Sequence, residues 1–285
     1  MWPNFLIIGA PRSGTTHLYR GLRQHPNIFM SDFKEPMFFA YEGNPRPGAI
    51  GDAAAYEALF SATQGQDAIG EASTLYLYSD RAADNIHRRI PDAKLIAILR
   101  NPVDRAFSQY TFQRFLNTEP LDTFEAALQA EDERADGPGS PFLLYRRVGL
   151  YGQQIPRYLE RFGPNQLLFL LQDDLDAAPG AVFRQIFAFL GVDETFQPDL
   201  RHRTNASGVP QHGTLFRLLK SAGRRIKGVL PERLATQLSG TAHEALLTRP
   251  TMDAPTRANL TEYFRGDIEA TQSLIGRDLS RWLTP

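Results

Sequence analysis

The sequence contains no cysteine in its 285 residues. A disulfide framework, a thiolate nucleophile and a zinc or iron–sulfur site built on cysteine are therefore excluded. No apolar run approaches the roughly 20 residues that a membrane-spanning helix needs. The first residues, Met1 to Ile8, lack the basic start and the long apolar core of a signal peptide. These absences predict a cytoplasmic protein without a membrane span.

The sequence also has almost no excess of either charge. Lys and Arg number 31 and Asp and Glu 32, so the formal net charge is −1. A broad nucleic-acid surface needs clustered Lys and Arg without compensating acids. We therefore expect no nucleic-acid partner, and any anion site must be local. With 42% hydrophobic residues and no linker-like break, the chain is expected to form a single domain over residues 1–285; its oligomeric state is not predicted.

Short apolar runs alternate with helical patterns along the chain. The clearest strand is Lys94-Leu-Ile-Ala-Ile-Leu99, which is nearly all apolar, as in a parallel strand buried on both faces. Residues 5–8, 27–30 and 166–171 are further predicted strands, and helices are predicted up to residue 24, from Pro102 onward, and over residues 153–162, 179–190 and 255–274. This order predicts a three-layer α/β fold with a central parallel sheet, in which ligands bind at the carboxyl ends of the strands.

The segment after the first predicted strand is Gly9-Ala-Pro-Arg-Ser-Gly-Thr-Thr16. Small residues between a strand and a helix let backbone N–H groups and the helix N-terminus converge on one point, an arrangement that binds phosphate or sulfate. Thr15 stands where the phosphate loop of nucleotide triphosphatases has lysine, and Arg12 is the loop's only cation. An ordinary nucleotide triphosphatase is therefore disfavoured. The alternative is a tight turn permitted by the glycines, with Arg12 solvated.

A second polar pair follows the strand over residues 94–99. Arg100 comes directly after it, and Ser108 lies eight residues further on, two turns along a helix that Pro102 can begin. Arg100 offers a planar fork that suits a phosphate, and Ser108 adds a hydroxyl on the same helix face. Taken alone, the pair also fits a salt-bridging arginine and a surface serine.

Together these motifs resemble those of the PAPS-dependent sulfotransferases, where PAPS is 3′-phosphoadenosine-5′-phosphosulfate. The family's 5′-phosphosulfate loop, P-[KR]-[SG]-G-T-T, is matched by Pro11 to Thr16, and its 3′-phosphate signature by Arg100 and Ser108. Lys34-Glu-Pro-Met-Phe-Phe39 resembles the K-E-P-H-F-F segment of heparan sulfate sulfotransferases, and Leu22-Arg-Gln-His-Pro26 resembles an L-x-x-H-P pattern of bacterial and carbohydrate-modifying members. The resemblance covers residues 4–192.

The resemblance implies a P-loop-like nucleotide-binding fold and a metal-free sulfotransferase. It implies transfer of a sulfuryl group from PAPS to a hydroxyl or amine of a small-molecule, glycolipid or carbohydrate acceptor, with adenosine 3′,5′-bisphosphate (PAP) as product. The residues that it assigns to the donor are Pro11, Arg12, Ser13, Gly14, Thr15, Thr16, Arg100 and Ser108. No His/Asp cluster at metal-ligand spacing is found in the sequence.

The resemblance also implies the catalytic residues. Glu35, at the position of the catalytic glutamate of carbohydrate sulfotransferases, is the expected general base; Arg12 stabilises the phosphosulfate, and Lys34 assists. Adjacent side chains of an extended segment point apart, so Lys34 and Glu35 are not expected to face the same way. The alternative for Glu35 is a surface carboxylate paired with Lys34. His17, close to the loop, is a second candidate base, with a packed or surface histidine as its alternative.

Several assignments stay open. Glu71-Ala-Ser-Thr-Leu-Tyr76 resembles a strand-end segment of the family, so Glu71 or Ser73 belongs either to the cleft or to the core. The same choice applies to aromatic residues that can line an acceptor pocket, which are Phe38, Phe39, Tyr41, Tyr76 and Tyr78. The competing functions are a Mg²⁺- and ATP-dependent phosphotransferase with Asp173-Asp174 as its acids, and a non-catalytic nucleotide-binding protein.

Three loops are also predicted from the sequence. Residues 43–51 are predicted to be an exposed excursion, and residues 136–141 a mobile loop that can form part of a substrate lid. The basic loop that closes over the nucleotide in this family has only loose candidates here, which are Arg201, Arg203 and Gly208, or residues 220–227.

Overall fold

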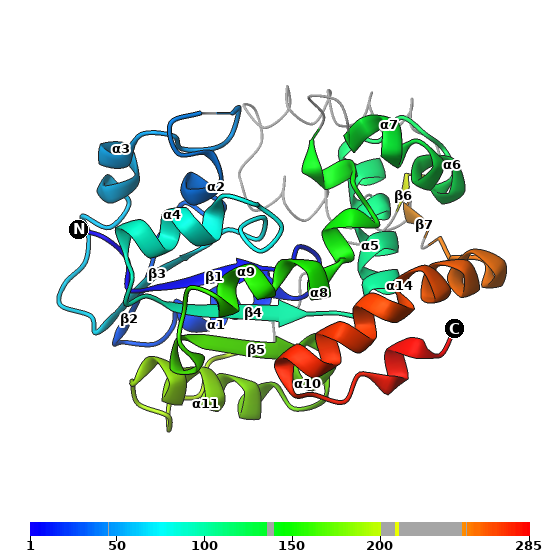
Figure 1. Ribbon diagram of the computed structural model, residues 1–285. Coiled ribbons are helices and arrows are strands. Elements are labelled where there is room, and N and C mark those ends of the chain that lie inside the picture. The colour runs from blue at the N-terminus through cyan, green and yellow to red at the C-terminus, as the bar shows by residue number, and fades with distance from the viewer. Residues whose placement is uncertain (45, 136–139, 201–208, 211–246, 249) are drawn as a thin grey trace, which may run out of the picture. The chain divides into compact units, whose positions relative to one another are not determined.

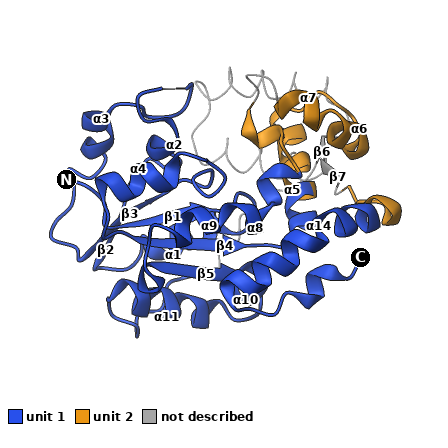
Figure 2. Cartoon of the chain, in the orientation of Figure 1, with its two compact units in different colours: residues 1–106, 146–204, 257–285 blue, residues 107–145, 205–256 orange. Residues whose placement is uncertain are grey.

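The computed structural model describes residues 1–44, 46–135, 140–200, 209–210, 247–248 and 250–285 (Figure 1). The chain divides into two compact units (Figure 2): unit 1 comprises residues 1–106, 146–204 and 257–285, and unit 2 comprises residues 107–145 and 205–256. The single domain expected over residues 1–285 stays a prediction. The candidates for the nucleotide-closing loop, and residues 136–139 of the predicted lid, lie outside the described residues.

Unit 1 is built on a five-stranded parallel sheet with the order β2-β3-β1-β4-β5. Its strands are β1 (Phe5–Gly9), β2 (Ile28–Met30), β3 (Ala68–Ala72), β4 (Lys94–Leu99) and β5 (Leu167–Leu171). Every residue of β1 and β3 is buried, as are all but the first of β4. Burial on both faces is the reason that β4 consists almost entirely of apolar residues.

Helices lie on both faces of this sheet, which confirms the predicted three-layer α/β fold. Figure 1 shows α4 on one side of the strands and α11 on the other. The helices of unit 1 are α1 (Thr15–Leu22), α2 (Phe38–Tyr41), α3 (Ala53–Ala58), α4 (Ala82–Arg89), α8 (Tyr151–Gln154), α9 (Pro156–Leu159), α10 (Gln172–Ala177) and α11 (Pro179–Leu190), with 3₁₀ turns η2 (Arg147–Gly149), η3 (Pro164–Gln166) and η4 (Ser280–Leu283). Helices α5 (Pro102–Leu116) and α14 (Ala254–Ile275) contribute residues to both units.

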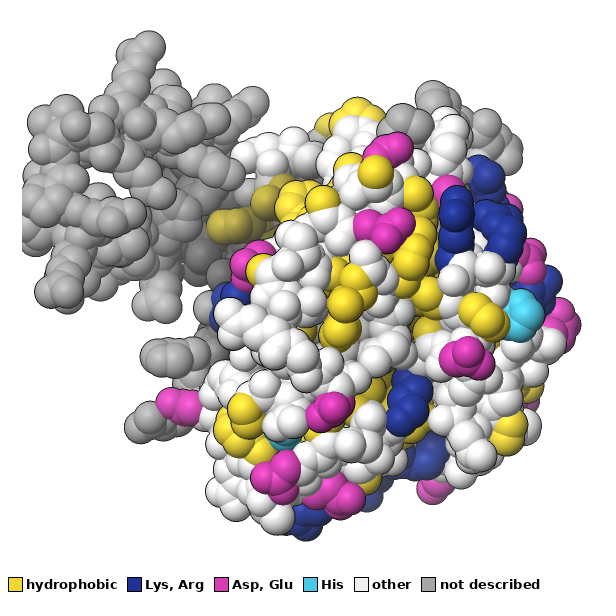
Figure 3. All heavy atoms as spheres, turned by 90° about the vertical axis from the view of Figure 1, so that its left-hand side faces the viewer, with side chains coloured by type: hydrophobic (Ala, Val, Ile, Leu, Met, Phe, Trp, Pro, Cys, Tyr) yellow, Lys and Arg dark blue, Asp and Glu magenta, His cyan; other side chains and the backbone are white. Residues whose placement is uncertain are grey.

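The described part of the chain contains no helix that is long and apolar enough to cross a membrane. Figure 3 shows the side of the molecule that carries the N-terminus in Figure 1. On this face acidic and basic side chains are interspersed, with apolar side chains between them. The described residues of this face do not form one continuous basic surface.

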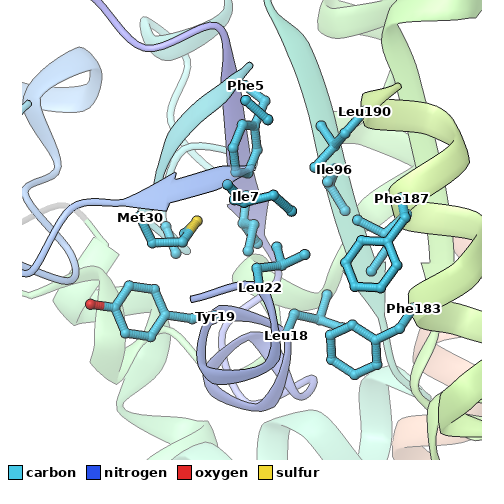
Figure 4. Close-up of a cluster of buried hydrophobic side chains, with 14 of the residues drawn as sticks. Phe5, Ile7, Leu18, Tyr19, Leu22, Met30, Ile96, Phe183, Phe187 and Leu190 are labelled. Carbon is cyan, nitrogen blue, oxygen red and sulfur yellow. The ribbon is translucent and has the colours of Figure 1, made fainter. Parts of the chain in front are cut away.

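One face of the sheet packs against α1 and α11 (Figure 4). The side chains at the centre of this cluster are Phe5, Ile7, Leu18, Leu22, Ile96, Phe183 and Phe187. Side chains alternate along a strand, so the other buried residues of β1 face the opposite helical layer. The close packing of α1 on α11 requires Gly21, because a Cβ there would lie 2.2 Å from Cζ of Phe183.

The strand order changes direction beside β1. From β1 the chain adds β2 and β3 on one side, and it then crosses through α4 to add β4 and β5 on the other side. In parallel sheets such a reversal leaves a crevice at the carboxyl ends of the strands, where ligands bind. The segments that follow β1, β3 and β4 are therefore the ones to examine for function.

Unit 2 contains the rest of α5, α6 (Phe124–Gln129), α7 (Glu131–Ala135), the 3₁₀ turn η1 (Pro141–Leu143) and the antiparallel pair β6 (Val209–Pro210) and β7 (Leu247–Thr248). Its buried Glu119 accepts hydrogen bonds from both Nη atoms of Arg134 at 2.6 and 2.8 Å, and from the Tyr145 hydroxyl at 2.6 Å. This bidentate pair fixes the segment after α5 to α7.

Candidate functional site

The turn between β1 and α1 presents backbone donors to an anion. Gly14 is the N-cap of α1 with φ 100°, and no side chain caps the helix. Arg12 also has a positive φ, 67°. The first N–H groups of a helix have no partner within the helix, and the helix dipole is positive at this end. Thr16 is exposed in the first turn, whereas Ser13 and Thr15 are buried beneath it. The turn thus has the form that the sequence predicts for an anion site.

Three arginines lie together at this turn. Nη1 of Arg100 donates a hydrogen bond to the carbonyl oxygen of Arg12 at 3.1 Å. Burial lowers the pKa of Arg12 to about 10, and the positive charges of Arg100 and Arg105 add to this effect. Like charges at short range destabilise one another. A bound anion relieves that repulsion, so the electrostatics here favour a phosphate or sulfate group.

Arg105 and Tyr151, which the sequence analysis did not select, interact with the arginines of this turn. Both are buried, and the Tyr151 hydroxyl donates to the carbonyl oxygen of Arg100 at 3.1 Å. Burial raises the pKa of Tyr151, although the charges of Arg105 and Arg100 act in the opposite direction. The sequence contained no direct signal for Arg105, because its burial on the same face of α5 as Pro102 and Gln109 is visible only in the structure.

Glu35 is held by the end of β3. Its carboxylate accepts a hydrogen bond from the backbone N–H of Thr74 at 2.8 Å and contacts Oγ1 of Thr74 at 3.1 and 3.2 Å. Its own backbone N–H donates to the carbonyl oxygen of Ala72 at 2.9 Å. The side chain is 25% exposed. The expected base is therefore fixed in place and open on one side.

Lys34 contacts Glu35 directly, since Nζ lies 2.5 Å from Oε1. The prediction that these neighbours point apart is wrong. It assumed an extended segment, but Glu35 has φ 65°, which turns its side chain toward Lys34. Pairing with Lys34, the alternative left open for Glu35, is therefore present, and it coexists with the contacts to β3.

Thr74, which binds the carboxylate of Glu35, lies close to Gly9, where the turn between β1 and α1 begins. A Cβ on Gly9 would lie 3.0 Å from the carbonyl oxygen of Thr74 and 2.8 Å from Cβ of Leu77. Only glycine fits there. The N–H of Leu77 also donates to the carbonyl oxygen of Ile8 at 2.8 Å. Residues 73–77 therefore connect the carboxylate of Glu35 to the start of the turn.

Glu71, near the end of β3, is fully buried. Tyr56 donates from its hydroxyl to Oε1 at 3.1 Å, and Ser73 donates to Oε2 at 2.8 Å. Burial raises the pKa of Glu71 to about 7, despite the hydrogen bonds that it accepts, and the charge of Glu35 contributes to the rise. The sequence left open whether Glu71 or Ser73 lies in the cleft or in the core. Both side chains are fully buried and therefore lie in the core.

Glu71 makes the free energy of unfolding depend on pH. Its folded-state pKa of about 7 exceeds the ordinary value of 4.5, so between these values the folded protein binds more protons than the unfolded chain. Stability therefore falls as the pH rises from 4.5 to about 7 and levels off above. Relative to Glu71→Gln, which does not titrate, the wild type should lose on the order of 3 kcal/mol over this interval in urea denaturation. A difference between the two proteins that stays constant with pH would contradict this expectation.

The remaining predicted residues fall in different places. Three of the candidate acceptor-pocket aromatics, Phe38, Phe39 and Tyr76, are fully buried and belong to the core. His17 is half-buried on α1, with its ring 6.0 Å from that of Phe183. Ser108 is half-buried on the part of α5 that belongs to unit 2, and its contact with the donor stays a prediction.

The acidic pair considered for a magnesium site is engaged by the C-terminal segment. Oδ2 of Asp173 accepts a hydrogen bond from Nε1 of Trp282 at 3.0 Å, and Oδ2 of Asp174 pairs with Arg277 at 2.7 Å. Among the described residues, no group of three or more His, Cys, Asp or Glu side chains is arranged to hold a metal ion. The pair therefore fastens α10 to the end of the chain.

Comparison with known proteins identifies the family. The family model described as the sulfotransferase domain matches residues 3–207. The chain belongs to the sulfotransferase family. This confirms the resemblance drawn from the sequence motifs, and the protein is an enzyme of the PAPS-dependent sulfotransferase class.

The sequence of this sulfotransferase is similar to those of curated proteins named for heparan sulfate. Mouse bifunctional heparan sulfate N-deacetylase/N-sulfotransferase 4 is 29% identical over 294 residues, which cover 99% of this chain and 31% of that protein. Human heparan sulfate glucosamine 3-O-sulfotransferase 6 is 30% identical over 244 residues, which cover 82% of this chain and 68% of that protein. The chain therefore spans about a third of the length of the bifunctional relative.

Solved structures agree with the family assignment. The crystal structure of a sulfotransferase from Alicyclobacillus acidocaldarius is 33% identical, with a TM-score of 0.78 and 99% of each chain covered. A mouse sulfotransferase complexed with PAP is 17% identical with a TM-score of 0.51, covering 99% of this chain and 87% of that chain. The second likeness shows a shared fold.

Proposed function

We propose that this sulfotransferase transfers a sulfuryl group from PAPS to a hydroxyl or amine of a carbohydrate or other small acceptor, with Glu35 as general base. The observation that carries the proposal is the close approach of Thr74 to Gly9, where a Cβ would lie 3.0 Å from the carbonyl oxygen of Thr74. Thr74 binds the carboxylate of Glu35, and Gly9 begins the turn between β1 and α1. A base and an anion site at one edge of the sheet are what this reaction needs.

The donor site follows from the charges at the turn. The backbone amides and hydroxyls of residues 11–16, together with the guanidinium of Arg12, would hold the 5′-phosphosulfate. Arg100, which donates to the carbonyl oxygen of Arg12, would bind the 3′-phosphate, the group to which the sequence motif also assigns Ser108. The pKa of Arg12 is lowered first by burial and then by the positive charges of Arg100 and Arg105, and an anion bound beside these charges would be stabilised by them, which supports this assignment. The related mouse structure contains PAP, which fits the same class of donor.

The chemical step needs a proton acceptor and charge stabilisation. The acceptor's O–H or N–H gives its proton to the carboxylate of Glu35. A bond forms from that oxygen or nitrogen to sulfur, and the bond from sulfur to the 5′-phosphate oxygen breaks, so that PAP leaves. Arg12, and Lys34 through its position beside Glu35, would stabilise the negative charge on the departing oxygen and the sulfuryl group.

For the acceptor we propose an amino-sugar-containing carbohydrate. The relatives named above are a heparan sulfate N-deacetylase/N-sulfotransferase and a heparan sulfate glucosamine 3-O-sulfotransferase. Residues 34–39 resemble a segment of heparan sulfate sulfotransferases. A test panel should contain heparan sulfate freed of its N-sulfate groups, N-sulfated heparan sulfate, and p-nitrophenol as a simple phenol. PAP release from PAPS with each acceptor would distinguish amine from hydroxyl transfer.

The proposal is tested by isothermal titration calorimetry with PAP and, separately, with ATP and Mg²⁺. The wild type should bind PAP selectively with a micromolar Kd, and Arg100→Ala should weaken that binding at least about 30-fold, because a bidentate arginine–phosphate contact is lost. Arg161→Ala, which removes a surface arginine paired with Asp84, is the matched control and should bind as the wild type does. Absence of PAP binding, or a preference for ATP with Mg²⁺, would overturn the proposal.

A further inference from the structure

The segment that carries the proposed base has a backbone that ordinary residues rarely adopt. Glu35 has φ 65° and Met37 has φ 53°, with Pro36 between them. Non-glycine residues remain in this left-handed region only where surrounding contacts hold them, and such residues are typical of active sites. The contacts that hold residues 35–37 therefore determine where the carboxylate of Glu35 lies.

Met37 is held by a buried relay that ends at Glu71. Its backbone N–H donates to Oγ of Ser73 at 2.9 Å, and the hydroxyl of Ser73 donates in turn to Oε2 of Glu71 at 2.8 Å. Both Ser73 and Glu71 are fully buried. Ala72 and Thr74, which follow Glu71 and Ser73 in the chain, bind Glu35 itself. The end of β3 and the two residues after it therefore hold the segment on both sides of Pro36.

A second route closes the relay into a ring of contacts. The other oxygen of Glu71 accepts the hydroxyl of Tyr56 from α3 at 3.1 Å. The ring of Tyr56 stacks on that of Phe38, with centroids 4.5 Å apart and planes 19° apart, and Phe38 follows Met37 in the chain. Glu71 is thus the one acid in a closed ring of contacting residues, whose other members are Ser73, Met37, Phe38 and Tyr56.

We propose that Glu71 is a positioning residue for Glu35, acting through Ser73 on the strained segment 35–37. The inference rests on the proposed role of Glu35 as base. Because Glu71 is fully buried, it does not touch the acceptor, and its effect passes through the backbone that carries Glu35.

The positioning should depend on the ionisation of Glu71. The ionised carboxylate can only accept, so the Ser73 hydroxyl points at it and leaves its lone pairs to the N–H of Met37. The protonated form can instead donate to Ser73 and compete for those lone pairs. The titratable groups that face Glu71 are Tyr56, Tyr76 and Glu35, and burial raises its pKa to about 7. The hydrogen bonds from Met37 to Ser73 and from Ser73 to Glu71 should therefore be stronger above this pH than below it.

Glu71→Gln is the test, because glutamine keeps the shape and copies the protonated acid at every pH. PAP release from PAPS is measured with the acceptor panel from about pH 5 to about pH 9. The ratio of wild-type to variant kcat should rise through neutral pH to about tenfold, the effect of a small misplacement of a reacting group. The Kd for PAP and the KM for the acceptor should stay within about twofold, since neither ligand contacts Glu71.

The matched control is Glu131→Gln, the same substitution at another fully buried carboxyl, in unit 2. Its kcat ratio to wild type should not change with pH. Ser73→Ala should lower kcat in the same way as Glu71→Gln while Glu71 is intact, because the relay is cut at its middle.

Hydrogen exchange at the backbone amides of Glu35 and of residues 37–39 gives a readout without any acceptor. In Glu71→Gln these amides should exchange faster than in wild type at about pH 8, after correction for the intrinsic rate. A flat kcat ratio together with unchanged exchange would overturn the inference. Full activity of Glu35→Gln, or absence of PAP binding in wild type, would instead contradict the proposed function and leave the exchange result to decide the role of Glu71.

Discussion

Glu35→Gln is expected to lower kcat by about 10²- to 10⁴-fold, which is the usual contribution of a positioned general base. Glutamine has the size of glutamate and can still accept the hydrogen bond from the N–H of Thr74, which lies 2.8 Å from the carboxylate. The segment should therefore stay in place. The amide cannot take up the acceptor's proton, so the loss is chemical rather than structural, and it is measured as PAP release at saturating PAPS.

Two controls separate this result from a general loss of folding. The Kd for PAP should change by less than about twofold in Glu35→Gln, since the proposed donor site is formed by the arginines of the turn and not by Glu35. Glu160→Gln, on a carboxylate that is 68% exposed beside Arg161, should retain the wild-type kcat. If Glu35→Gln keeps more than about a third of the wild-type kcat, the base lies elsewhere, and His17 becomes the next residue to substitute.

Arg12→Ala is expected to lower kcat by about 10²- to 10³-fold, the range found when one donor to a developing negative charge is removed. Arg12 lies at the turn with Arg100 and Arg105 beside it, and burial together with these charges lowers its pKa to about 10. In this environment of low water content a single positive group acts strongly on the group being transferred. PAP release at saturating PAPS is again the measurement.

Substitution of Arg12 and substitution of Arg100, the two arginines of the proposed donor site, should change different measured quantities. PAP lacks the sulfuryl group, so Arg12→Ala should change the Kd for PAP less than it changes kcat, whereas Arg100→Ala should mainly weaken PAP binding. Arg12→Lys should restore part of kcat, because lysine supplies the charge but not the planar fork. Arg20→Ala, on the exposed side of α1, should behave as wild type. Equal losses of kcat in Arg12→Ala and Arg20→Ala would contradict the assignment.

The elements with strong local patterns were predicted closely. β4 (Lys94–Leu99) and α11 (Pro179–Leu190) have the predicted bounds, and α14 (Ala254–Ile275) differs from the predicted helix by one residue at each end. In each of these elements, apolar residues recur at the spacing that is typical of a strand or of a helix. Pro102 and Pro179 in addition mark the starts of helices, a signal that can be read from the sequence alone. Such signals lie within a few residues of one another and need no tertiary context.

The stretch from residue 52 to residue 93 was not resolved into elements by its sequence. It contains α3, β3 and α4. The strand β3 reads Ala-Ile-Gly-Glu-Ala, and glycine, alanine and glutamate are all depleted in strands. It forms because β1 and β2 pair with it on both sides. Gly70 fits there because the ring of Phe5 lies where a Cβ would stand, 2.5 Å from Cζ.

The sequence by itself determined the parallel α/β class and the family, and it selected Arg12, Glu35 and Arg100 as candidate site residues, because all of these rest on residue types at short, fixed spacings. Only the tertiary structure decided that Lys34 turns to Glu35, that Arg105 lies buried beside Arg12, and that the pKa of Glu71 is raised to about 7. The physical reason is that backbone φ at a constrained site, charge–charge distance and desolvation all depend on neighbours contributed by other strands and helices.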